Sequence, residues 1–156
     1  MQDITDFHEA ELNAAAAMRS WGFLDAVATT GGSDGGVDVR SHDALAQVKW
    51  RSNATGRPEV QQLVGARGSG RQKLFFFSKS GYTRQAVEYA DTMSVALFVI
   101  DAAGGVSSVN GHARPYGAKW WALPFVGITR DDWVVLGLFT LALVGAGVFW
   151  MLYLSS

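Results

Sequence analysis

The stretch GGSDGGVDVRSHDALAQVKW, from Gly31 to Trp50, decides the fold, because a glycine-rich loop is followed there by two short apolar runs. Side chains alternate between the two faces of a strand, so Gln47 and Lys49 share one face. If the polar residues 41–43 turn the chain, Asp38 lies beside Gln47 on the neighbouring strand. An acid, an amide and an ammonium group then converge on one point.

These three groups suit metal-assisted hydrolysis of a phosphodiester. Magnesium ions prefer one or two carboxylates together with water and phosphate oxygens. The metal polarises the phosphate and generates a hydroxide near neutral pH. A lysine beside it stabilises the negative charge that develops in the transition state. The hairpin therefore predicts a candidate site for a divalent cation and a phosphate ester.

The rest of the chain predicts an α/β fold with a mixed central sheet. Glycines and prolines divide it into helical and strand-like segments. We expect helices over 5–21, 58–66 and 82–93, and strands over 23–30, 37–40, 44–50, 73–78 and 95–101. The order is α-β-β-β-α-β-α-β, in which the first strands are antiparallel and the last strands are joined by right-handed parallel crossovers. Residues 104–117 are expected to be a linker.

The charges are unevenly distributed along the chain. Residues 1–39 hold seven acids and one base, whereas residues 40–84 hold nine bases and two acids, a net charge of +7. Such a cluster predicts a surface that binds nucleic-acid phosphate. The alternative is a solvated face beside an anionic membrane leaflet. The residues expected to contact DNA are Arg51, Arg57, Arg67, Arg71, Lys73 and Lys79.

The segment WVVLGLFTLALVGAGVFWMLYL, residues 133–154, contains no charged residue. It matches the roughly 20 apolar residues that a helix needs to cross a bilayer, and aromatic residues lie near both ends. A buried core helix of this kind would need a larger protein to cover it. We therefore expect one transmembrane helix, preceded by an interfacial linker over 113–132 and a head domain over 1–112.

The positive residues that flank this segment set its orientation. Arg114, Lys119 and Arg130 all precede it, and positive residues favour the cytoplasmic side. The head domain should therefore lie in the cytoplasm, on the inner membrane. The chain has no cysteine, so it has neither disulfides nor a thiolate metal site.

Several motifs together resemble a known nuclease family. They are Glu11 in ELNAAAAMRSWGF, Asp38 in GGSDGGVDV, Gln47 with Lys49 in AQVKW, and the later segment RQKLFFFSKSGYTRQAVEYA. With the order of elements, they resemble the PD-(D/E)xK nuclease superfamily, specifically the Mrr-like restriction endonucleases. The first helix is similar to that of archaeal Holliday-junction resolvases, whose acid occupies the position of Glu11. The resemblance covers roughly residues 6–101.

The resemblance implies a restriction-endonuclease-like three-layer fold and a DNA endonuclease dependent on Mg²⁺ or Mn²⁺. Asp38 would be the main metal ligand, Gln47 a second ligand, and Glu11 would support the metal from the first helix. Lys49 would orient the attacking water and stabilise the phosphorane. Gln47 stands where most of the superfamily carries an acid, so metal binding should be weaker than with glutamate.

Three functional interpretations follow from these patterns. The first is a membrane-anchored DNA endonuclease that acts in restriction or defence against foreign DNA. The second is a non-catalytic DNA-binding or tethering module that retains the nuclease fold. The third is a membrane protein whose basic face binds anionic lipid.

A nuclease with one active site would cut both DNA strands either as a homodimer or by sequential nicks. Gln61 and Gln62 could contact phosphate or base, although an exposed helix position is favoured for Gln61.

Overall fold

The computed structural model describes residues 4–29 and 36–117. The expected transmembrane helix over 133–154 and residues 118–132 of the expected interfacial linker lie outside these ranges, whereas residues 113–117 of that linker are described. Within them, no helix combines the length and the apolar character that crossing a bilayer requires.

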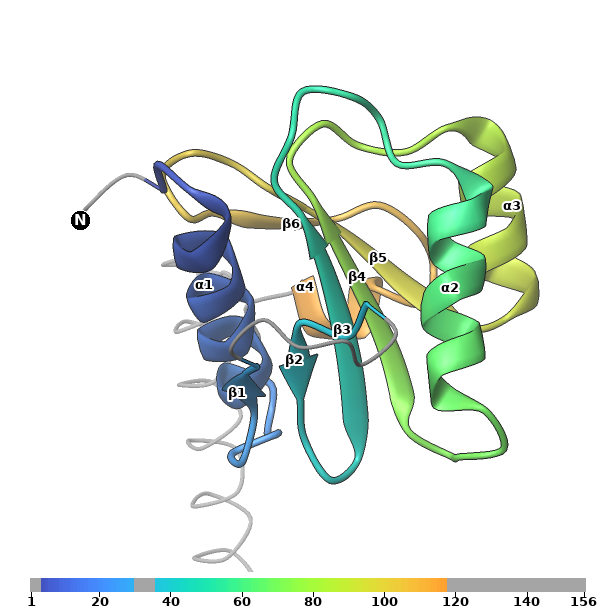
Figure 1. Ribbon diagram of the computed structural model, residues 1–156, viewed down its shortest axis with the longest axis horizontal. Helices are drawn as coiled ribbons and strands as arrows, with labels where there is room; N and C mark the ends of the chain where they lie inside the picture. The colour runs from blue at the N-terminus through green and yellow to red at the C-terminus, as the bar shows by residue number, and fades with distance from the viewer. Residues whose placement is uncertain (1–3, 30–35, 118–156) are drawn as a thin grey trace, which may run out of the picture. The chain divides into compact units, whose positions relative to one another are not determined.

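The described chain forms three layers, in which a central sheet is covered by α1 on one face and by α2 and α3 on the other (Figure 1). The helices are α1 (Phe7–Ser20), α2 (Arg57–Arg67), α3 (Arg84–Thr92) and α4 (Arg114–Gly117). The strands are β1 (Val27–Ala28), β2 (Val39–Arg40), β3 (Ala44–Lys49), β4 (Lys73–Ser78), β5 (Val95–Ile100) and β6 (Val106–Ser108). The six-stranded sheet has the order β1-β2-β3-β4-β5-β6. The pairs β3–β4 and β4–β5 are parallel, and the other neighbours are antiparallel. The predicted mixed α/β architecture is thus confirmed.

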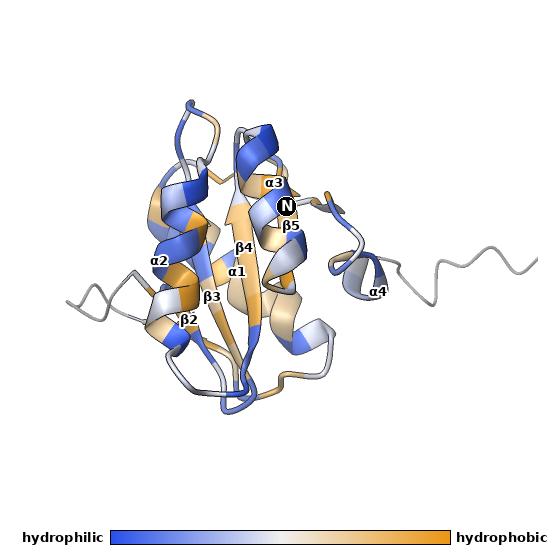
Figure 2. Ribbon diagram, turned by 90° about the vertical axis from the view of Figure 1, so that its right-hand side faces the viewer, coloured by the Kyte–Doolittle hydropathy of each residue, from blue (hydrophilic) through white to orange (hydrophobic). Residues whose placement is uncertain are grey.

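The central strands are buried on both faces, as Figure 2 illustrates for the apolar β4 between the helical layers. On one face α1 presents mainly alanines, including Ala10 and Ala14, which are fully buried against Phe75 and Phe98. Their small side chains let the helix approach the sheet closely. On the other face α2 and α3 pack against Phe76 and its neighbours. Strands covered on both sides read as continuous apolar runs, which is why KLFFFS and VALFVI are so hydrophobic.

Side-chain caps fix the residue at which α1 begins. Asp6 accepts a hydrogen bond of 2.9 Å from the backbone N–H of Glu9. Glu9 reaches back to accept from the backbone N–H of Thr5 at 2.6 Å and from its hydroxyl at 2.9 Å. These contacts satisfy donors that the first turn leaves unpaired. Glu11 therefore lies in the first half of the helix.

The structure differs from the prediction at the end of the described chain. Residues 104–117 are not a linker, because β6 pairs with β5 and α4 follows it. The buried side chain of Asn110 holds this segment in place. Its Oδ1 accepts from the backbone N–H of Leu97 at 3.1 Å, and its Nδ2 donates to the carbonyl of Val95 at 2.9 Å. The expected strands over 23–30 and 37–40 are also shorter, since only two residues of each pair in the ladder.

Candidate active site

The β2–β3 hairpin brings Asp38 against the backbone of β3. Val39 pairs with Ala46 in the ladder, so the position before it, Asp38, lies next to Gln47. The backbone N–H of Asp38 donates to the carbonyl of Ala46 at 2.9 Å. Its carboxylate accepts from the backbone N–H of Val48 at 2.7 Å. This acid is therefore fixed at the strand segment that carries Gln47 and Lys49.

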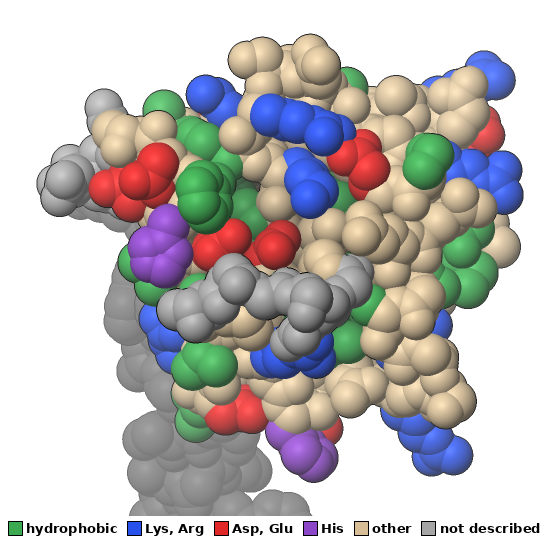
Figure 3. All heavy atoms as spheres, viewed as in Figure 1, with side chains coloured by type: hydrophobic (Ala, Val, Ile, Leu, Met, Phe, Trp, Pro, Cys, Tyr) green, Lys and Arg blue, Asp and Glu red, His purple; other side chains and the backbone are tan. Residues whose placement is uncertain are grey.

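A second carboxylate reaches the same place from α1. The side chain of Glu11 is only 13% exposed, and its Oε2 lies 3.5 Å from Nδ1 of His8, one turn earlier. Burial raises the pKa of Glu11, and the negative charge of Asp38 raises it further. Figure 3 shows acidic side chains on this face beside α1, with Lys and Arg side chains near them. Two carboxylates from distant parts of the chain are thus close enough to repel each other.

Lys49 partly offsets this repulsion. Burial raises the pKa of Asp38, whereas the hydrogen bond from Val48 and the positive charge of Lys49 lower it. The net direction is upward, so loss of water outweighs both favourable contacts. Two carboxylates that are costly to ionise are typical of a site that gains a cation.

Gln47 is the least expected feature of the site. The sequence suggested an open polar face shared with Lys49, but the structure buries Gln47 completely, with 0% exposure. Its strand neighbour Leu45 packs in the core under α2, and alternation places Gln47 on the same side. Neither Oε1 nor Nε2 of Gln47 has a hydrogen-bond partner among the described residues. A buried amide left unpaired costs free energy, so its presence calls for a ligand.

These donors fit a divalent metal ion of the magnesium type. No group of three His, Cys, Asp or Glu side chains comes together in the part of the chain that the structure describes. The candidate donors are instead the two neighbouring carboxylates of Asp38 and Glu11 and the unpaired amide oxygen of Gln47, which lies on the strand that pairs with the Asp38 segment. Magnesium is commonly held by one or two carboxylates and keeps several waters.

Comparison with known proteins assigns the chain to a family. Residues 3–103, well over half of the chain, match the model of the Mrr catalytic domain, described as a restriction endonuclease. The chain belongs to the Mrr-type restriction endonuclease family. No curated protein and no solved structure gives a significant match. The Mrr-type match spans all four predicted site residues and every element from α1 to β5.

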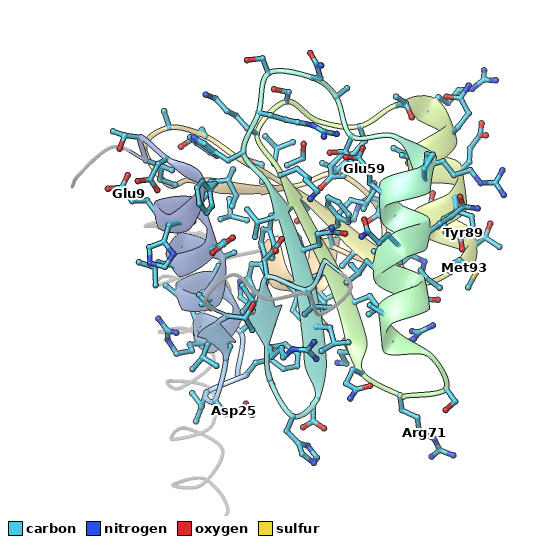
Figure 4. The ribbon with its side chains drawn as sticks, viewed as in Figure 1. Glu9, Asp25, Glu59, Arg71, Tyr89 and Met93 are labelled. Carbon is cyan, nitrogen blue, oxygen red and sulfur yellow. The ribbon has the colours of Figure 1, made fainter. Side chains whose placement is uncertain are left out.

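The basic residues predicted to contact DNA divide between two opposite edges of the sheet, one at the carboxyl ends and one at the amino ends of the parallel strands β3 and β4. Lys49 and Ser78 are in register at the carboxyl ends of the parallel strands β3 and β4. Arg51 and Lys79, directly after these strands, and Arg57, at the start of α2, therefore lie on the edge near Lys49. Those on the opposite edge, at or after the end of α2, are Arg67, Arg71 and Lys73. Figure 4 labels Glu59, near the start of α2, and Arg71, in the loop that follows the end of α2.

Most of the basic residues at the Lys49 edge are oriented by neighbouring side chains. Arg51 pairs with Glu59 on the first turn of α2. The ammonium group of Lys79 lies over the ring of Trp50, 4.7 Å from its centroid. The two loops are also tied together, because the hydroxyl of Ser80 donates to the carbonyl of Arg51 at 2.6 Å. This edge is therefore a fixed basic surface next to the two carboxylates.

Two residues near the site were not among the predicted catalytic or metal-binding residues, although Gln62 was named as a candidate DNA contact. His8 contacts Glu11 from the preceding helical turn. Gln62 of α2 approaches Gly36, next to Gln47. An i, i+3 pair such as His8 and Glu11 can be found from sequence once the helix is known. The position of Gln62 depends on how α2 packs over β3.

Replacing Glu11 with glutamine should stabilise the metal-free protein at neutral pH. A raised pKa means that the folded state binds the proton more tightly, so the free energy of unfolding falls as pH rises between the unfolded and folded pKa values. Glutamine cannot ionise, so the variant escapes this loss. We expect the unfolding midpoint of the variant to be higher than that of the parent at neutral pH, and the difference to disappear below about pH 4.

Thermal unfolding of the full chain at several pH values, with a chelator present, would measure this gain. Glu88→Gln serves as the control, because Glu88 is exposed and forms an ion pair with Arg84 one turn earlier in α3. A midpoint that is unchanged or lower for Glu11→Gln at neutral pH would contradict the strained carboxylate pair.

Proposed function

We propose that this chain is a metal-dependent DNA endonuclease of the PD-QxK type that acts in restriction or defence against foreign DNA. The observation that carries the proposal is the proximity of two mutually repelling carboxylates, Asp38 and Glu11, at the strand segment that carries the buried, unpaired Gln47 and Lys49. Structural ion pairs would instead place opposite charges together. The membership of the nuclease family supports the same reading.

Three side chains would hold the ion. Asp38 and Glu11 would supply carboxylate oxygens, and Gln47 would supply its amide oxygen. When bound, Mg²⁺ or Mn²⁺ supplies charge stabilisation at the phosphate and lowers the pKa of a coordinated water. The backbone N–H of Val48 holds one oxygen of Asp38, which leaves the other oxygen for the ion.

Lys49 would act on the phosphate. It lies one residue beyond Val48 at the end of β3, and its charge is felt at Asp38. An ammonium group there can orient the attacking water and stabilise the extra negative charge on the phosphorus centre. Arg51 and Lys79, on the same edge, would hold the DNA backbone by charge.

Cleavage of supercoiled plasmid DNA by the full chain tests this proposal. We expect nicked and then linear DNA in Mg²⁺ or Mn²⁺, and none when a chelator removes the metal. One set of catalytic residues per chain cuts one strand at a time, so linear product requires a homodimer or two successive nicks. Absence of cleavage with either metal, under conditions where the chain binds DNA, would refute catalysis.

The same assay decides the second candidate function, a non-catalytic DNA-binding module. The amide at position 47 favours it, because a neutral oxygen holds a cation more weakly than a carboxylate does. That function predicts DNA binding that weakens steeply with salt and is accompanied by no turnover. Any metal-dependent nicking that Asp38→Ala abolishes would exclude it.

We further propose that residues 133–154 anchor the nuclease in the inner membrane with its head in the cytoplasm. The support is the uncharged run of 22 residues and the basic residues that precede it.

We expect the full chain to stay in the membrane fraction after high-salt and alkaline washes, and a chain ending at residue 132 to be released. Release of the full chain by these washes would contradict the anchor. Flotation of the shortened chain with anionic vesicles would instead point to lipid binding by its basic face.

A further inference from the structure

We propose that Gln62 is a positioning residue of the nuclease site, which fixes the orientation of the Gln47 amide. The inference rests on the proposed function, since it assumes that the oxygen of Gln47 binds a divalent ion. It adds a residue from α2 to the site.

The observation concerns the space beside Gly36, the residue that leads into the Asp38 segment. A Cβ atom at Gly36 would lie 2.7 Å from Nε2 of Gln47 and 3.0 Å from Nε2 of Gln62. Both amide groups therefore occupy the volume that a side chain at this position would fill. The two glutamines, from β3 and α2, are neighbours across Gly36.

Glycine at position 36 makes this approach feasible for two reasons. Its φ of +83° is a left-handed conformation that residues with a side chain rarely adopt. Its missing side chain also leaves room for both amides, because a distance of 2.7 Å to a Cβ atom is a clash. Glycine at position 36 therefore leaves space for the exposed side chain of Gln62 to lie beside the buried side chain of Gln47.

A glutamine ligand needs such a neighbour, whereas a glutamate does not. The two ends of an amide have almost the same shape but opposite hydrogen-bonding character. A flip exchanges a metal-binding oxygen for a nitrogen whose protons repel the cation. In the structure the nitrogen of Gln47 is the end nearest Gly36. The nitrogen of Gln62 also points there, and the nitrogen of Gln47 has no partner among the described residues. A half-turn of the Gln62 amide would present its oxygen to the nitrogen of Gln47, and that hydrogen bond would leave Oε1 of Gln47 for the ion.

The chain provides a matched control in the adjacent residue. Gln61 and Gln62 are both exposed on the same turn of α2. Of the two, Gln62 is the one that lies against Gly36. Substitution of either residue by alanine removes the same atoms and makes a similar change in helix propensity, so a difference between the variants reports the contact.

The test is Mn²⁺ binding to the full chain, measured by the decrease in the EPR signal of the free ion, with Asp38→Asn to identify binding at this site. Outer-shell contacts of metal ligands are typically worth about 10- to 100-fold in affinity. We expect Gln62→Ala to weaken Mn²⁺ binding by about 10-fold, and Gln61→Ala to leave it within about 2-fold. Thermal midpoints of the two variants should agree, because both positions are exposed.

The Gln47→Glu variant provides the decisive comparison. The two oxygens of a carboxylate are equivalent, so orientation no longer matters, and adding Gln62→Ala to Gln47→Glu should change Mn²⁺ affinity by less than about 2-fold. Equal affinities for the Gln61→Ala and Gln62→Ala variants would overturn the inference. So would an effect of Gln62→Ala that persists at full size in the Gln47→Glu background. Absence of Asp38-dependent Mn²⁺ binding in the parent protein would instead overturn the proposed function itself.

Discussion

Replacing Asp38 with asparagine should reduce metal-dependent DNA cleavage on the order of 10³-fold or more, a loss of about 4 kcal/mol in transition-state stabilisation. The carboxylate is the donor that connects the other parts of the site. It is fixed by Val48, repels Glu11 and feels the charge of Lys49. Asparagine keeps an oxygen that can accept from Val48, so the hairpin should be retained while the charge that holds the cation is lost.

The same substitution should not weaken the fold. Burial raises the pKa of Asp38, so ionisation of this group above the unfolded pKa makes the folded state less stable. In metal-free buffer at neutral pH, Asp38→Asn should therefore unfold at the same or a higher temperature than the parent. Circular dichroism melting and plasmid nicking, measured on one preparation, separate the loss of activity from the stability.

Asp25 offers the matched control for this prediction. Its carboxylate accepts from the hydroxyl of Ser41 at 2.8 Å and from the backbone N–H of His42 at 2.7 Å. These hydrogen bonds lower the pKa of Asp25, so its ionised form favours the folded state above the unfolded pKa. Asp25→Asn should lower the unfolding midpoint at neutral pH and leave the cleavage rate of the folded protein close to that of the parent. Nicking by Asp38→Asn at the parent rate would show that the site lies elsewhere.

Replacing Lys49 with methionine should lower the rate at saturating DNA by about 10²- to 10³-fold, the scale observed when one preorganised donor to a transition state is removed. Methionine keeps much of the length and apolar surface of the lysine stem, so packing at the end of β3 should change little. The affinity for DNA should fall only as expected for the loss of one phosphate contact. Single-turnover cleavage over a range of DNA concentrations separates the two quantities.

Lys79→Met is the comparison for this second prediction. Lys79 follows the neighbouring parallel strand, and its ammonium group lies over Trp50. We expect this variant to bind DNA more weakly and with a smaller salt dependence, yet to cleave at nearly the parent rate once DNA is saturating. Equal effects of the two substitutions on the saturated rate would remove the distinction between a catalytic lysine and a binding lysine.

The hairpin and its register could be predicted from sequence because they depend on local pattern. Alternation along 44–50 and the polar turn at 41–43 were enough to place Asp38 beside Gln47, and the observed pairing of Val39 with Ala46 agrees. The parallel strands were equally clear, since continuous apolar runs separated by helices leave few topologies. Family resemblance added Glu11, whose proximity to Asp38 depends on a contact between distant segments.

Other features depend on packing that no local pattern records. The three residues of β6 carry little strand signal, and their place is set by the buried amide of Asn110. A count of basic residues along the chain cannot show that the end of α2 turns Arg67 and Arg71 away from the edge near Lys49. The burial of Gln47 was also missed, because a polar residue on an alternating strand usually faces water, whereas α2 covers this one.

The central claim is that Asp38, Glu11 and Gln47 together hold one divalent metal ion next to Lys49. The most direct test is the stoichiometry and affinity of Mn²⁺ binding to the full chain, with Asp38→Asn and Asp25→Asn measured in parallel. The account predicts one Mn²⁺ site per chain, from which Mg²⁺ displaces Mn²⁺, and this site is lost in Asp38→Asn and retained in Asp25→Asn. Binding of Mn²⁺ that is the same in the parent and in Asp38→Asn would contradict it.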